Sequence, residues 1–220
     1  KATHLLLQQE DYERAKASAR QACWFASRHA LFFHQGWHLL QLAIIDLEAS
    51  TSASSNNIES SLGPILECLH LSERYVMDPL RAAAQMSLGR VFLYMGRICK
   101  ARALLNAAIP LLMQHGHVWF QAEAYLSLAK CYLAEVSSED NTETSSSKLQ
   151  LRQNATVQLE KAASLFEKIE DTHRLRQVYY LQARIHQFLP TNQEKRDEAA
   201  KKFIMLNKMK QNKLSGRKQW

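Results

Sequence analysis

The sequence contains few of the residues that interrupt helices and no run suited to a membrane. Only six glycines and four prolines occur in 220 residues, which leaves few turn signals for a fold built from many short strands. No run of 18 apolar residues occurs, and the N-terminus lacks the layout of a signal peptide. We therefore expect long helices joined by short turns, and no membrane association.

Motifs that carry common chemistry are also missing. The sequence shows no Ser/His/Asp set, no H-E-x-x-H, no Walker loop and no G-x-G-x-x-G, and its nine histidines lack ligand spacing. His115-Gly116-His117 has no carboxylate or cysteine beside it, so we expect a solvated turn rather than a metal site. We accordingly expect no catalytic activity, no cofactor, no metal and no small-molecule substrate.

The four cysteines lie one in each of four helical regions and never form a C-x-x-C pair. This pattern predicts buried free thiols in a reducing, intracellular compartment rather than disulfides or zinc ligands. The four are Cys23, Cys68, Cys99 and Cys131.

The positive charge is concentrated at the C-terminal end. The formal net charge is +7, yet residues 195–220 hold nine Lys or Arg against two acidic residues, and residues 1–194 hold 19 of each sign. The high pI therefore describes the end of the chain and not its body. We expect residues 207–220 to form a basic flexible tail.

The stretch 82–108 alternates small and large residues as a tightly packed helical hairpin requires. Gly89, Ala101 and Ala108 are small where two helices approach, while Phe92 fills the space between them and Gly96 allows the turn. With Gly89 at position 8, the stretch matches the tetratricopeptide signature at Leu88, Gly89, Phe92, Gly96, Ala101 and Ala108.

Further copies of this pattern follow at irregular intervals. The small residue recurs at Ala129 and Ala183, which lie 40 and then 54 residues further along, and Tyr132 repeats the position of Phe92. Ala162 and Phe166 supply the inward face of a later helix. We predict an all-α, tetratricopeptide-like solenoid of about five antiparallel helix pairs over residues 1–206, with a right-handed superhelix and a mobile polar insertion at 137–148.

The expected helix limits follow from caps and breakers. Asp78 and Pro79 are expected at the N-cap and first position of one helix, Pro64 places another helix start near Leu62, and Pro110 is expected to kink its helix. Lys1 falls within a helical pattern, so we expect the chain to be a segment of a longer protein. The expected helices are 3–8, 10–29, 30–49, 58–76, 78–95, 98–115, 118–136, 149–169, 172–189 and 193–207.

One pattern points to a binding surface. The residue after each small position is basic, at Arg90, Lys130 and Arg184, and in a tetratricopeptide helix this position faces the concave groove. Together with Tyr180, these residues are candidate contacts for an acidic segment. The alternative is that they pair with Glu123 or Glu160.

The repeat register has consequences for peptide binding and for stability. Met86 and Leu126 stand where a carboxylate-clamp adaptor carries lysine, so a chaperone-tail adaptor is disfavoured. We expect Gly89→Leu to cost about 1–3 kcal/mol by overpacking, and Arg90→Ala to leave folding nearly intact.

Residues 126–206 resemble a known family. The segments LSLAKCYLA (126–134), LEKAASLFEKIED (159–171) and RLRQVYYLQARIHQFL (174–189) are similar to the C-terminal helical repeats of anaphase-promoting complex subunit 5. The resemblance implies a scaffold subunit of a multi-subunit ubiquitin ligase of mitosis, bound to sister subunits in the nucleus and cytoplasm and without an active site. The Ser/Thr-rich insertion and the basic tail depart from the family.

Two other hypotheses stay open. A free-standing repeat adaptor would bind isolated acidic peptides in its groove. A helical nucleic-acid binder would use the basic tail and would lose affinity steeply with salt.

Overall fold

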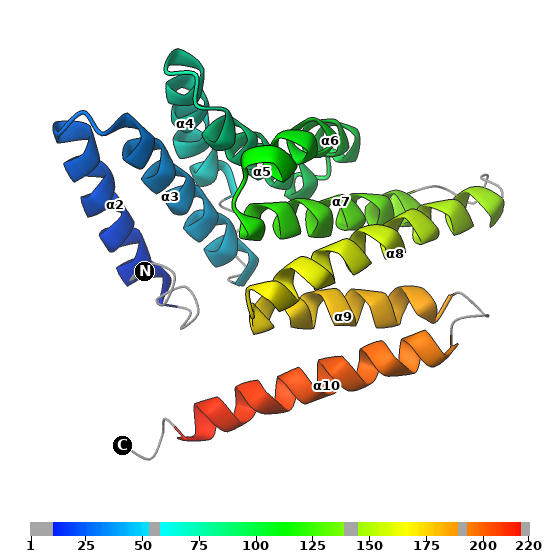
Figure 1. Ribbon diagram of the computed structural model, residues 1–220. Coiled ribbons are helices and arrows are strands. Elements are labelled where there is room, and N and C mark those ends of the chain that lie inside the picture. Colours follow the sequence, from blue (N-terminus) through cyan, green and yellow to red (C-terminus); the bar gives the residue numbers. More distant parts are fainter. Residues whose placement is uncertain (1–10, 53–57, 139–144, 189–192, 217–220) are drawn as a thin grey trace. The chain divides into compact units, whose positions relative to one another are not determined.

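A computed structural model describes residues 11–52, 58–138, 145–188 and 193–216, and these ranges contain helices and no strand (Figure 1). The all-α prediction is therefore confirmed. The helix expected at 3–8, the loop residues 53–57 and the last four residues of the expected tail lie outside the described residues. Along the chain the elements are α2 (Tyr12–Arg28), α3 (Phe32–Ser52), η1 (Ile58–Ser61), α4 (Leu62–Arg74), α5 (Asp78–Tyr94), α6 (Ile98–His115), α7 (Val118–Ser138), α8 (Ser145–Lys168), α9 (Thr172–His186) and α10 (Gln193–Gly216).

The chain divides into two compact units, residues 1–127 and 128–220, so that α7 contributes its first half to one unit and its second half to the other. In the first unit α2 packs against α3, α3 against α4, α4 against α5 and α5 against α6, and α5 also contacts α3. In the second unit α8 packs against α9 and α9 against α10, with alternating directions (Figure 1). Helices packed in adjacent antiparallel pairs are the architecture of a helical-repeat solenoid.

Helix α5 is the most deeply packed helix of the first unit. Its buried residues fall on several faces, because α5 has α3, α4 and α6 around it. A Cβ placed on Gly89 would lie 3.0 Å from Leu105 Cγ and 3.4 Å from the Ala101 carbonyl oxygen, both on α6. Only a residue without a side chain permits this distance without displacing Leu105.

Four of the turns between helices share one backbone form. Each has a residue in the left-handed region two residues after the helix ends, at Ala30, Val76, Gly96 and Glu170. The following residue donates its N–H to a carbonyl of the last helical turn, as Arg97 does to Phe92 at 2.8 Å and Asp171 does to Phe166 at 3.1 Å. This pattern is a Schellman-type helix end, and it confirms the left-handed conformation expected at Gly96.

The small residue used to set the repeat register recurs at the same position along four helices. It is the twelfth residue of α3, α5, α7 and α9. In order these residues are Ala43, Gly89, Ala129 and Ala183. The first three are buried and Ala183 is half-buried, and Ala43 is a copy that the sequence reading missed. The irregular spacing therefore comes from the second helices and the loops, while the first helix of each pair keeps a fixed register.

Several expected limits need correction. The N-cap of α5 is Met77, so Asp78 is its first residue and binds Arg81 at 2.7 Å instead of capping the helix. Helix α10 does not end at Asn207 but continues to Gly216, because lysine, methionine, glutamine and leucine are good helix formers even without an apolar stripe.

Two further corrections concern the polar insertion and helix α9. Helix α7 extends to Ser138 and α8 begins at Ser145, so both ends of the insertion are helical. Helix α9 ends at His186 rather than at Leu189. The helix starts at Leu62, Ile98 and Val118 agree with the expected positions.

Candidate interaction site

Arg90 is the most deeply buried charged residue among those predicted to line a groove. Its side chain is 1% exposed, its Nη2 lies 2.8 Å from Glu48 Oε1, and its Nε lies 3.2 Å from Glu123 Oε1. It is therefore not accessible to an acidic partner. The pairing with Glu123 that stood as the alternative is the one observed, and Glu48 adds a second carboxylate that the sequence reading did not name.

The electrostatics of this group, the Arg90 cluster (Glu48, Arg90 and Glu123), follow from burial and proximity. Burial by itself lowers the pKa of Arg90, but the carboxylates of Glu123 and Glu48 outweigh it and raise the pKa above its ordinary value. The guanidinium thus stays charged. Removal of the arginine would leave two carboxylates in this space without a cation.

The shared helix register explains why these three residues meet. Arg90 directly follows the small residue of α5, Glu48 comes five residues after that of α3, and Glu123 comes six residues before that of α7. All three face the same space between first helices. The Arg90 cluster therefore joins α3, α5 and the first half of α7 within the first unit.

The other candidate groove residues lie in the second unit, where their surroundings differ. Tyr180 is 47% exposed and its ring centroid lies 5.8 Å from that of Phe203 on α10. The exposed guanidinium of Arg184 lies over the Tyr180 ring at 5.8 Å, and Lys130 is half-buried. Binding of an acidic segment by Lys130, Arg184 and Tyr180 stays a prediction.

A neighbouring tyrosine ties the second unit together. The hydroxyl of buried Tyr179 donates to the Glu167 carboxylate on α8, and Lys202 Nζ of α10 lies 5.4 Å from the centre of the Tyr179 ring. Burial and the bond to Glu167 raise the pKa of Tyr179. Tyr179 therefore contributes to packing among three helices.

The residues predicted to pack the repeats divide into two groups by burial. Five are buried, namely Gly89, Ala101, Ala129, Ala162 and Phe166. Three are half-buried, namely Phe92, Tyr132 and Ala183.

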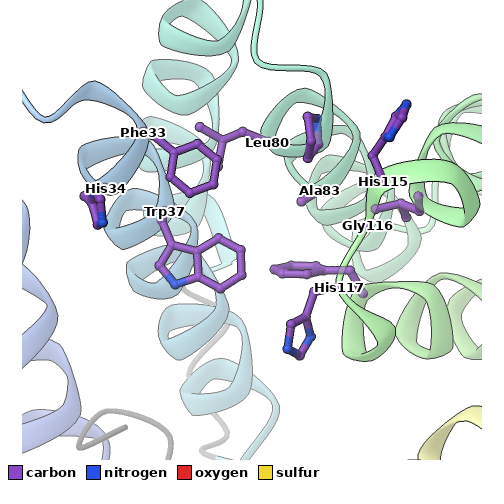
Figure 2. Close-up of a pocket in the computed structure, with 11 residues that line it drawn as sticks. Phe33, His34, Trp37, Leu80, Ala83, His115, Gly116 and His117 are labelled. Atoms are coloured by element: carbon purple, nitrogen blue, oxygen red, sulfur yellow. The ribbon is translucent and has the colours of Figure 1, made fainter.

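An aromatic cavity lies in the first unit, beside the turn that joins α6 to α7. We call this cavity of about 500 Å³ the aromatic pocket, and Figure 2 shows Trp37 extending from α3 toward this turn. The Trp37 and Phe120 rings meet edge to face, with centroids 5.5 Å apart. The apolar walls of the aromatic pocket come from Phe33, Trp37, Leu80, Leu112 and Phe120. Three further lining residues are the histidines His34, His115 and His117.

The turn at the mouth of this pocket is held in place by hydrogen bonds from one side chain to two backbone carbonyls. The Gln121 amide donates to the carbonyls of Leu112 at 2.8 Å and Gly116 at 3.0 Å. A Cβ on Gly116 would lie 2.5 Å from the Leu112 carbonyl oxygen, so the turn excludes larger residues. The exposed His115 and His117 of this turn were expected to be solvated, and they also border a cavity that the sequence reading missed.

The described residues also bear on three other features, namely metal-ligand groups, bilayer-crossing helices and cysteines. Within residues 11–52, 58–138, 145–188 and 193–216, no group of three or more His, Cys, Asp or Glu side chains is placed to hold a metal ion. In the same ranges each helix is too short or too polar to cross a bilayer. Cys68 is buried, and burial followed by the charge of Glu67 raises its pKa to about 12. Cys99, however, is exposed and Cys23 is half-buried, which corrects the expectation that every cysteine is buried.

Fold and site together define a helical-repeat protein with a buried charged cluster and an aromatic cavity. No protein-family model matches the chain. Among curated proteins, anaphase-promoting complex subunit 5 of Homo sapiens is 29% identical over 147 residues, which cover 67% of this chain and 19% of the relative. The same subunit of Pongo abelii gives the same values, and that of Rattus norvegicus is 29% identical over 143 residues, 65% of this chain.

The chain is thus similar to anaphase-promoting complex subunit 5, and it spans about a fifth of the length of the curated relatives it matches. Among solved structures, BtubC (BKLC) from P. vanneervenii is 15% identical, with a TM-score of 0.40. The match covers 91% of this chain and 92% of that chain. That score is too low to bear on fold or function.

Proposed function

We propose that the chain is a tetratricopeptide-like segment of a non-catalytic scaffold subunit of the anaphase-promoting complex, or cyclosome, an E3 ubiquitin ligase that controls mitotic progression and exit. Its partners are sister subunits of that complex, and it works in the nucleus and cytoplasm. The observation that carries this proposal is the similarity to subunit 5 over 147 residues. That similarity falls on a fold of stacked helix pairs, which presents extended surfaces for binding other proteins.

The experiment is recovery of the assembled complex. The full-length protein carries an affinity tag, is purified from dividing cells, and its co-purifying proteins are separated by size and identified by mass spectrometry. The scaffold proposal predicts that the tagged protein elutes with other ligase subunits. Elution as a monomer without any ligase subunit would contradict it.

A second candidate is a free-standing adaptor for acidic peptides, and the exposed Tyr180 beneath Arg184 is the observation that favours it. This candidate predicts that Arg184→Glu abolishes binding of an acidic peptide, while Arg20→Glu, a reversal at an exposed arginine of α2, does not. A scaffold that uses the same residues would instead lose sister subunits with Arg184→Glu. The two readouts separate the candidates.

A further inference from the structure

The turn from α2 to α3 carries an unusually apolar surface for a solvated helix end. Trp24 is 61% exposed, Phe25 is 52% exposed and Phe33 is 47% exposed, and Leu31 lies exposed between them. Single exposed apolar residues are ordinary, whereas clustered ones mark binding surfaces. Tryptophan and phenylalanine are also the residue types enriched where proteins bind one another.

Two cavities adjoin this surface and share one residue. The aromatic pocket measures about 500 Å³, and a second pocket of about 480 Å³ lies between α2 and the start of α3. His34 borders both, and Figure 2 shows it on the side of α3 away from the 115–117 turn. Each volume falls within the range of about 300–1,000 Å³ that is usual for binding pockets. The surface can therefore accept two bulky groups, one on each side of His34.

No formally charged residue lines the described part of either cavity, one cation lies beside them, and the carboxylate of Glu67 accepts a hydrogen bond from Gln35, the neighbour of His34 in sequence. The described lining residues include four histidines and no carboxylate, and the guanidinium of Arg28 lies over the Trp24 ring at 5.4 Å. Asp78, which precedes the lining residue Pro79, is paired with Arg81. Imidazole N–H groups and a guanidinium present hydrogen-bond donors to carboxylates.

We infer that this surface, formed by the aromatic pocket, the second pocket and the α2–α3 turn, binds an acidic segment of a partner protein through two bulky apolar side chains. The apolar side chains occupy the two cavities, and the flanking carboxylates meet the histidines and Arg28. A nucleic acid fits less well, because the walls of both cavities are apolar and Arg28 is a single cation, whereas nucleic-acid binding draws on several phosphate contacts. The inference does not depend on membership of a ubiquitin ligase.

Binding to a defined probe tests this inference on the full chain. The probe is a short labelled peptide that alternates glutamate and phenylalanine, and its affinity is measured by fluorescence anisotropy. We expect it to bind, and we expect matched peptides with serine for phenylalanine or lysine for glutamate to bind at least about tenfold more weakly, the factor for loss of one anchor.

Matched variants then locate the site. Phe33→Asp should weaken peptide binding about tenfold. Phe188→Asp changes a phenylalanine of similar exposure, 55%, in the second unit and should leave binding unchanged. His115→Asp should weaken binding and His70→Asp, an exposed histidine of α4, should not. Circular dichroism confirms that each variant is folded.

Several results would overturn the inference. They are no binding of the glutamate–phenylalanine peptide, equal binding of the lysine peptide, an equal loss in Phe33→Asp and Phe188→Asp, or tighter binding of a single-stranded oligonucleotide at the same surface. None of these results affects recovery of the assembled complex, so failure here is distinct from failure of the scaffold proposal.

Discussion

Helices α5 and α9 place an arginine at the same point and use it in opposite ways. Arg90 and Arg184 both directly follow the small residue of the repeat. Arg90 is buried between Glu48 and Glu123, whereas Arg184 is exposed over the ring of Tyr180. The repeat position thus fixes where a side chain points, and the residues of neighbouring helices decide whether it stabilises the fold or remains available for binding.

The largest difference in stability is expected when each arginine is replaced by an uncharged residue. Arg90→Met leaves two carboxylates in a buried space, and we expect it to lower the free energy of unfolding by about 3–5 kcal/mol. Arg184→Met should change it by less than about 0.5 kcal/mol, as for most exposed positions. Urea unfolding monitored by circular dichroism measures both. This replaces the expectation from sequence that Arg90→Ala leaves folding nearly intact.

A compensated variant shows whether the charge itself is responsible. Arg90→Met combined with Glu48→Gln and Glu123→Gln should recover much of the stability lost by Arg90→Met alone, because no unpaired charge is left buried. If Arg90→Met and Arg184→Met unfold at the same urea concentration, the cluster does not stabilise the fold.

The next largest loss of stability is expected from enlarging the small residues that precede the two arginines. Gly89→Leu forces a side chain against Leu105, and we expect a loss of about 1–3 kcal/mol by overpacking. Ala183→Leu, at the half-buried equivalent on α9, should cost less than half as much. Thermal unfolding of both variants measures the difference, and equal losses would mean that the two helix crossings are equally close.

The turns that precede α5 and α9 predict a smaller effect. Val76 has φ of 53° and Glu170 has φ of 54°, a region that is most unfavourable for a β-branched residue. Val76→Gly should therefore stabilise the protein by about 1 kcal/mol, and Glu170→Gly by less. Calorimetry of the two variants tests the order, and a loss of stability in Val76→Gly would contradict it.

The smallest expected effect is a pH dependence confined to α9. Burial and the charge of Lys195 lower the pKa of His186 below its ordinary 6.5, against an opposing influence of Glu160. The unfolded chain therefore binds a proton at a higher pH than the folded chain, so stability present above pH 6.5 is lost as the pH falls toward the lowered pKa. His186→Gln should unfold with a shallower dependence between pH 7.5 and about 5.5, whereas the exposed His70→Gln should match the wild type.

The helical class and most helix limits could be predicted because they depend on local signals. Pro64 and Gly96 act through their own backbone, and the small residue of α5 is followed by two close copies. The N-cap of α5 was misplaced by one residue, since Met77 offers no side-chain oxygen and the Asp-Pro pair is the stronger local signal.

The candidate sites were harder to predict because they depend on distant residues. The burial of Arg90 needs Glu48, which lies 42 residues away, and no local pattern links the two. The aromatic pocket needs Trp37 and Phe120 on different helices. The available signal was the density of aromatic and histidine residues in 32–38 and 115–120, which becomes informative only once the register of α3 and α7 is known.

The Arg90 cluster couples the opening of three helices of the first unit. Repeat proteins with contacts only between neighbours can open one hairpin at a time from an end. The cluster gives α3, α5 and the first half of α7 a shared interaction across 42 residues of sequence between Glu48 and Arg90, and opening any one of them exposes the charges of the other two. Local fraying is thereby suppressed, and the amide hydrogens of these helices should exchange with solvent together, as one cooperative unit.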